Sequence, residues 1–182
     1  DMEKKIVSEN IQTLLFCSPH NPTGRVWEKW EIENVVNLCG KLGVKIVSDE
    51  IWADFIVNPD CKHIPTQSVS DLAKEIVTAN YAPSKTFNLA GLQGSYSVTY
   101  NKQMRDKIDK ISSTTHSNAV SLLTLEACIG AYTGGAEYVD EMLKYVRKNH
   151  AEQQRTQPGG DHHKQTDHDQ RQHNSGTGTQ YL

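Results

Sequence analysis

Short apolar runs separated by polar turns mark the first half of this chain. Ile11 to Cys17 is one such run, and the prolines and glycine that follow it predict a buried strand ending in a rigid turn. Val44 to Ser48 and Ile76 to Tyr81 are similar in length and character. Ser95 to Tyr100 has the alternating pattern of a further strand. We therefore predict four strands.

Apolar positions with helical spacing lie between and after these runs. Ile32 to Leu42 has this spacing, and a short helix is predicted around Val69 to Lys74. From Asn101 onward the pattern is helical, with a break at Gly134-Gly135. The last helix is expected to bury one face, formed by Tyr138, Met142, Tyr145 and Val146. Strand, helix, strand with short connections is typical of a parallel sheet, so the predicted class is α/β, with a mainly parallel sheet flanked by helices.

Composition divides the chain near Asn149. Residues 151–182 contain no Ile, Val, Phe, Trp, Met or Cys, and Gln, His, Asp, Gly and Thr dominate there. Such a segment cannot bury enough apolar surface to offset the entropy of ordering, so we predict a folded region at residues 1–150 and a disordered polar tail at 151–182. A flexible tract of this kind binds metals weakly even though it contains histidines, and no metal site is predicted.

Overall composition restricts the class of protein. The 182 residues carry a formal net charge of -3 and are 36% hydrophobic, which suits one soluble domain with a real core. That charge balance gives no indication of nucleic-acid binding, and no apolar run is long enough to cross a bilayer. The first residues lack the features of a signal peptide, so a cytoplasmic location is expected. The four cysteines occur singly and are expected to be free thiols.

Three polar residues follow three successive predicted strands: Asn21, Asp49 and Lys85. Each has an ordinary structural explanation, as a turn residue, a helix cap and a solvated lysine respectively. Parallel sheets bind ligands at the carboxyl ends of their strands, however, so the three side chains are expected to lie at one site. Together they match the needs of pyridoxal 5'-phosphate: an amine for its aldehyde, an acid for its ring nitrogen and a neutral donor for its phenolic oxygen.

Three motifs occur in a fixed order along the chain: Ser18-Pro-His-Asn-Pro-Thr-Gly24, Ser48-Asp-Glu-Ile51 and Ala82-Pro-Ser-Lys-Thr-Phe-Asn-Leu-Ala-Gly-Leu92. They resemble the signatures of the fold-type I pyridoxal-phosphate enzymes, the class I/II aminotransferase superfamily. The resemblance runs from Ile11 to Asn149 and implies that residues 1–150 are a partial PLP-transferase large domain, with the amino-terminal and carboxy-terminal parts of such enzymes absent. We therefore expect an incomplete chain that is weakly active or inactive.

The resemblance implies specific roles for residues in these motifs. Lys85 would form the Schiff base with the cofactor and act as the catalytic base, Asp49 would pair with the pyridine nitrogen, and Asn21 would bond the phenolic oxygen. Ser84 would hold the phosphate. The Asn21-Pro22 peptide would be cis, as is usual in this family. Trp52 occupies a cofactor-binding position where related enzymes have tyrosine or histidine, and its indole can donate a hydrogen bond but cannot exchange a proton.

Within the superfamily, the chain is most similar to the carbon–sulfur β-lyase branch, the MalY/PatB-type cystathionine β-lyases. His20 and Gln93 indicate this branch, because many aminotransferases have a phosphate-binding arginine where this chain has Gln93. The implied substrate is an amino acid, cystathionine or another cysteine S-conjugate, from which β-elimination gives a thiol, pyruvate and ammonia. Intact relatives would be homodimers. Two alternatives remain open: a class I/II aminotransferase, and a non-catalytic fragment that retains relic motifs.

Overall fold

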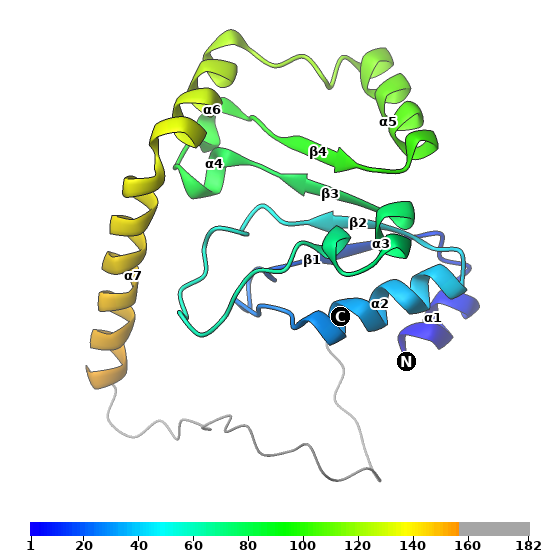
Figure 1. Cartoon of the computed structure of the whole chain (residues 1–182), viewed down its shortest axis with the longest axis horizontal. Coiled ribbons are helices and arrows are strands. Elements are labelled where there is room, and N and C mark those ends of the chain that lie inside the picture. Colours follow the sequence, from blue (N-terminus) through cyan, green and yellow to red (C-terminus); the bar gives the residue numbers. More distant parts are fainter. Residues whose placement is uncertain (157–182) are drawn as a thin grey trace, which may run out of the picture.

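The computed structural model describes residues 1–156 (Figure 1). The strands are β1 (Thr13–Cys17), β2 (Lys45–Asp49), β3 (Val77–Tyr81) and β4 (Tyr96–Thr99). The α-helices are α1 (Met2–Ser8), α2 (Lys29–Lys41), α3 (Asp71–Ile76), α4 (Pro83–Thr86), α5 (Lys102–Thr115), α6 (Leu122–Gly134) and α7 (Ala136–Thr156), and 3₁₀ turns lie at Thr66–Ser68 and Ala90–Leu92. The four predicted strands are present, whereas α1, α4 and the two 3₁₀ turns are additional to the predicted elements.

One sheet organises the described residues, with strand order β1-β2-β3-β4. β1, β2 and β3 are parallel, and β4 pairs antiparallel with β3. The predicted α/β class with a mainly parallel sheet is therefore confirmed. The antiparallel direction of β4 was not predicted, because alternation of apolar and polar residues is the same for either strand direction. In register, Asp49 lies between Cys17 on β1 and Asn80 on β3.

The main core lies on one face of the sheet, against the first three helices. Its buried members come from α1, α2, α3, the inward positions of the strands and the residue before β2: Ile6, Phe16, Ile32, Val36, Cys39, Val44, Ile46, Ala73, Ile76 and Val77. Side chains alternate between the two faces of a strand, so the residue beside Phe16 points the other way. That residue, Leu15, is 78% exposed. The described residues therefore cover one face of the sheet and leave the other open near Leu15.

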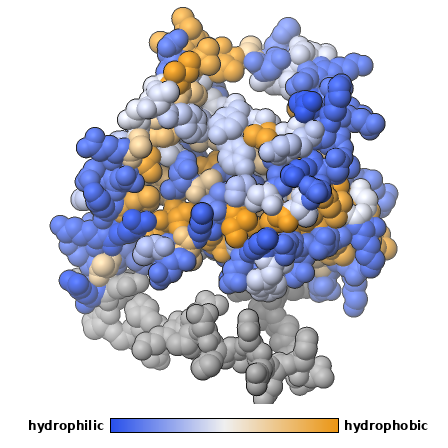
Figure 2. Space-filling model, in the orientation of Figure 1, coloured by the Kyte–Doolittle hydropathy of each residue, from blue (hydrophilic) through white to orange (hydrophobic). Residues whose placement is uncertain are grey.

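The last two helices form the most exposed part of the described structure. The apolar residues of α6 are not confined to one face of the helix, and Leu122, Leu123 and Leu125 are all exposed. Figure 2 shows the resulting hydrophobic surface at the top of the molecule, around the start of α6. α7 extends along the side of the molecule to Thr156, beyond Asn149 where the composition changes (Figure 1). Of the predicted tail at 151–182, residues 151–156 belong to α7, and residues 157–182 lie outside the described residues.

The inward face predicted for the last helix was partly wrong. Met142 and Val146 are half-buried, but Tyr138 and Tyr145 are 48% and 66% exposed. The buried apolar residue of α7 is Leu143. A helical pattern shows which positions are apolar, but burial requires a neighbouring element, and the described residues contact α7 over only part of its circumference.

Candidate active site at the strand ends

Asp49 occupies the carboxyl end of the central strand β2. Its side-chain Oδ1 accepts a hydrogen bond from the Ile51 N–H at 3.2 Å, which orients the carboxylate. Its backbone carbonyl accepts a hydrogen bond from the Ser18 N–H at 2.9 Å. The second contact joins the end of β2 to the start of the loop that contains Asn21. Two of the three predicted strand-end segments are therefore adjacent.

A hollow of about 540 Å³ lies beside this carboxylate. Its lining combines apolar side chains from β1 and β2 with polar ones at the strand ends: Leu15, Phe16, Cys17, Val47, Asp49, Ile51, Asn80 and Ser95. The volume is within the range of roughly 300–1,000 Å³ that small-molecule sites occupy. An apolar floor with one carboxylate at its edge suits a flat ring that carries a basic nitrogen.

Asn21 lies in the loop between β1 and α2 and is exposed. The Asn21-Pro22 peptide is cis, which confirms the expectation drawn from the family resemblance, and the Ser18-Pro19 peptide is cis as well. Around Asn21 the loop is closed by hydrogen bonds, from the His20 N–H to the Arg25 carbonyl at 2.8 Å and between the side chains of His20 and Thr23 at 2.8 Å. The Asn21 side-chain amide therefore lies on a loop that is stabilised by its own hydrogen bonds.

Lys85 lies on the single-turn helix α4, which begins at Pro83, a residue suited to the first turn of a helix. The lysine is exposed, and its Nζ lies 5.6 Å from the centroid of the Trp52 ring, a cation–π contact. Trp52 in turn packs edge-to-face against Phe55, with ring centroids 5.3 Å apart. Ser84, next to Lys85, is half-buried. The structure therefore brings Trp52 and Lys85 together, whereas Lys85 lies outside the lining of the hollow beside Asp49.

Glu50, which follows Asp49, is a fully buried carboxylate that the sequence did not single out. Its Oε1 accepts hydrogen bonds from Ser48 Oγ at 2.9 Å and from the Thr66 N–H at 3.0 Å. Its Oε2 accepts from His63 Nε2 at 2.8 Å and from Tyr81 Oη at 2.7 Å. Burial raises the pKa of Glu50, but the hydrogen bonds and the charge of His63 outweigh burial, and the pKa lies below its ordinary value of 4.5. Glu50 is therefore ionised at neutral pH.

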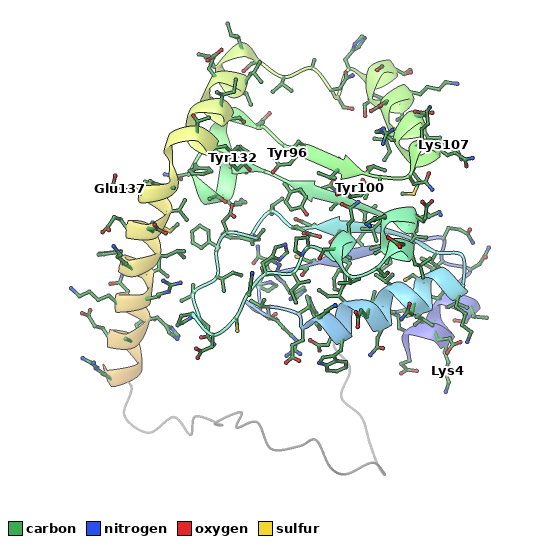
Figure 3. The ribbon with its side chains drawn as sticks, viewed as in Figure 1. Lys4, Tyr96, Tyr100, Lys107, Tyr132 and Glu137 are labelled. Carbon is green, nitrogen blue, oxygen red and sulfur yellow. The ribbon has the colours of Figure 1, made fainter. Side chains whose placement is uncertain are left out.

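A second cavity, of about 250 Å³, lies next to this carboxylate. It is lined by Glu50, Ile51, Ala53, Asp54, His63, Tyr81, Ala82, Tyr96 and Tyr132. Figure 3 shows Tyr96 of β4 and Tyr132 of α6 next to each other, and their ring centroids are 6.2 Å apart. Burial raises the pKa of Tyr81 and Tyr132, so both phenols stay protonated at neutral pH. No sequence signal marks this cluster, because its members come from segments far apart in the chain.

Residues 1–156 contain neither a cluster of metal ligands nor a membrane-spanning helix. No group of three potential ligands among His, Cys, Asp and Glu is close enough to hold a metal ion within these residues. No helix in the same range has the length and apolar content needed to cross a membrane.

Comparison with known proteins identifies relatives over most of the chain. Residues 1–155 match the family described as aminotransferase class I and II. Cystathionine beta-lyase PatB of Bacillus subtilis is 34% identical over 149 residues, which cover 82% of this chain and 38% of PatB. Protein MalY of Escherichia coli is 33% identical over 149 residues, which cover 81% of this chain and 37% of MalY.

Solved structures of pyridoxal-phosphate enzymes are also similar to this chain. Cystalysin from Treponema denticola, whose crystal structure contains pyridoxal 5'-phosphate, superposes with a TM-score of 0.77 at 33% identity. That match covers 82% of this chain and 38% of cystalysin. This chain thus spans little more than a third of the length of the relatives that it matches. The resemblance found in the three sequence motifs, both to the family and to its PatB/MalY branch, is confirmed.

Proposed function

The chain belongs to the aminotransferase class I and II family, and on that premise we propose that it acts as a pyridoxal-phosphate-dependent carbon–sulfur β-lyase. The observation that supports this choice most directly is its similarity to cystathionine beta-lyase PatB, at 34% identity over 82% of the chain. The proposed substrates are cystathionine or another S-substituted cysteine. The proposed products are a thiol, pyruvate and ammonia, and the proposed assembly is a homodimer.

The described residues fit pyridoxal 5'-phosphate by the chemistry of their donor groups. Asp49 offers a carboxylate at the edge of a hollow large enough for the pyridine ring. Lys85 offers an exposed primary amine on the neighbouring turn, and Asn21 offers an amide on the loop joined to Asp49. The cofactor, when bound, supplies an aldehyde carbon for an amine and a ring that accepts electrons.

Each side chain then has a defined task. The Asp49 carboxylate would accept a hydrogen bond from the ring nitrogen and keep it protonated, and the Asn21 amide would donate to the phenolic oxygen. The Ser84 hydroxyl would donate to a phosphate oxygen. The Trp52 ring lies beside the Lys85 amine. Lys85 would hold the cofactor through its Nζ, and the same amine, when free, would accept the proton from the α-carbon of the amino acid.

Cofactor binding is the first test, because it does not depend on turnover. Purified chain mixed with pyridoxal phosphate is expected to develop a visible absorption band. Borohydride should then fix the cofactor covalently to the peptide that contains Lys85, as shown by mass spectrometry. Lys85→Arg is the matched control, since it keeps the positive charge but removes the primary amine. A band of equal intensity in Lys85→Arg would contradict the assignment of Lys85.

Reaction type is the second test, because the aminotransferase alternative uses the same residues up to removal of the α-proton. The lyase is expected to release pyruvate and a thiol from cystathionine in equal amounts. An aminotransferase would instead convert an added keto acid to its amino acid without releasing thiol. Transfer without thiol release would overturn the lyase assignment and leave the family assignment intact. Cofactor binding without either reaction would favour a non-catalytic chain.

A further inference from the structure

Two hydrogen bonds connect the turn that contains Lys85 to the segment that follows Asp49. On one side of Lys85, Tyr81 Oη donates to Glu50 Oε2 at 2.7 Å. On the other side, Thr86 Oγ1 donates to Asp54 Oδ2 at 2.9 Å. Between these two bonds lies the contact of Lys85 Nζ with Trp52. The segment from Glu50 to Asp54 thus touches the Lys85 turn at three successive places.

The first of these bonds is held by a buried anchor. The Glu50 side chain is 0% exposed, and its four hydrogen-bond donors come from β2, β3 and the segment around His63 and Thr66. A carboxylate fixed by four donors has one orientation, so Tyr81, the last residue of β3, is fixed with it. The hydrogen bond from Tyr81 to Glu50 therefore fixes the end of β3, from which the chain continues to Lys85.

The second bond acts closer to the amine. Thr86 is adjacent to Lys85 and only 2% exposed, whereas its partner Asp54 lies two residues after Trp52. α4 is a single turn, and a helix of four residues has little stability of its own. Its orientation must therefore come from tertiary contacts, and the charge-assisted Thr86–Asp54 hydrogen bond is the one nearest to the lysine.

We propose that Glu50 and Asp54 are positioning residues, which hold the Lys85 turn against Trp52 and so direct the Lys85 amine toward the cofactor. Glu50 acts through Tyr81, and Asp54 acts through Thr86. The part that concerns the cofactor rests on the function proposed above. The part that concerns the position of Lys85 holds for the chain without cofactor and is tested separately.

The test without cofactor uses the ring current of Trp52 as its signal. In chain labelled with ¹³C at Cε of lysine, the Lys85 resonance is assigned by its loss in Lys85→Arg. The methylene protons at Cε are expected to be shifted upfield, because the adjacent Nζ lies over the Trp52 ring. Thr86→Val should remove most of that displacement. Thr86→Ser, which keeps the hydroxyl, should retain it.

Two further variants complete this test. Thr78→Val is a matched control, because it also removes a hydroxyl from a buried threonine. The Thr78 hydroxyl pairs with that of Thr99, with 2.6 Å between the two oxygens, and makes no contact with the Lys85 turn. It should leave the Lys85 resonance unchanged. Asp54→Ala removes the other partner of the bond at an exposed position, so it remains informative if Thr86→Val fails to fold. An unchanged Lys85 resonance in folded Thr86→Val or in Asp54→Ala would overturn the proposal.

The test with cofactor measures the Kd for pyridoxal phosphate by its visible absorption. Thr86→Val is expected to raise the Kd by about tenfold, as loss of a hydrogen bond to a charged group does, and Thr86→Ser should restore it. Tyr81→Phe should raise the Kd less, because Glu50 keeps its other donors. If wild-type chain shows no absorption, the proposed function fails for this chain, while the resonance of Lys85 still decides the positioning role.

Discussion

The two faces of the sheet differ sharply in this chain. On one face, Ile46 is fully buried against the helices, and the Glu50 side chain is buried with four hydrogen-bond donors. On the other face, Leu15 is 78% exposed, and Asp49 borders an open hollow. Glu50 and Asp49 are neighbours in sequence, yet side chains alternate between the two faces at the end of the strand. The Glu50 side chain is therefore buried, whereas Asp49 lines the hollow. The closed face holds the buried core, and the open face holds the hollow that we propose as the binding site.

The strongest test of this difference removes a buried side chain from the closed face. Ile46→Ala is expected to lower the free energy of unfolding by about 2–5 kcal/mol, since it removes apolar contacts and leaves a cavity in the core. Urea denaturation followed by circular dichroism measures this change. A loss below that range would mean that the closed face contributes less to stability than its burial indicates.

An intermediate effect is expected for the buried carboxylate. Glu50→Gln should lower the free energy of unfolding by about 1–3 kcal/mol, because it leaves donors without a charged acceptor. The loss should depend on pH. The pKa of Glu50 is lower in the folded chain than its ordinary value of 4.5, so the ionised group stabilises the fold above that pH, and this stabilisation disappears as the pH falls through the folded pKa.

Urea titrations at a series of pH values test this dependence. Wild-type chain should lose stability more steeply than Glu50→Gln as the pH falls below 4.5. Asp71→Asn is a suitable control, because Asp71 is an exposed carboxylate paired with Lys74 and should contribute little. Parallel pH profiles for wild type and Glu50→Gln would show that Glu50 is not held in its ionised form by this network.

The smallest effect is expected on the open face. Leu15→Ala should change the free energy of unfolding by no more than about 0.5 kcal/mol, because its side chain is already largely in solvent. The same denaturation experiment measures it beside Ile46→Ala. A loss as large as that of Ile46→Ala would mean that the open face is covered in solution, and the contrast between the two faces would then not hold.

Much of the fold was predictable because local pattern reflects local structure. β1 was predicted from a run of apolar residues and β2 from another, and the α2 helix from apolar spacing between Ile32 and Leu42. The one-turn helix α4 was not predicted, since four residues give too short a pattern to distinguish a helix from a loop. The expected burial of Tyr138 and Tyr145 was wrong. Apolar periodicity shows which residues share one face of a helix, but it does not show whether another element packs against that face.

The candidate site also contains residues that sequence motifs identify and residues that only the structure reveals. Asn21, Asp49, Trp52, Ser84 and Lys85 were selected from motifs, and the structure brings Trp52 against Lys85 and the Asn21 loop against the end of β2. Their roles stay predictions until the cofactor experiments are done. Glu50 lies within the second motif, yet the sequence assigns it no role, because nothing local shows that its carboxylate turns inward to meet His63 and Tyr81.

By itself, the sequence determined the family, the α/β class and the residues with the chemistry for a pyridoxal-phosphate site, because motifs and apolar spacing depend on residues close together in the chain. The tertiary structure alone decided which carboxylate is buried, which face of the sheet is open and what holds the Lys85 turn. Thr86 and Asp54 are 32 positions apart, and only folding brings their side chains to 2.9 Å. Contacts of this kind depend on the packing of whole elements, which no short stretch of sequence specifies.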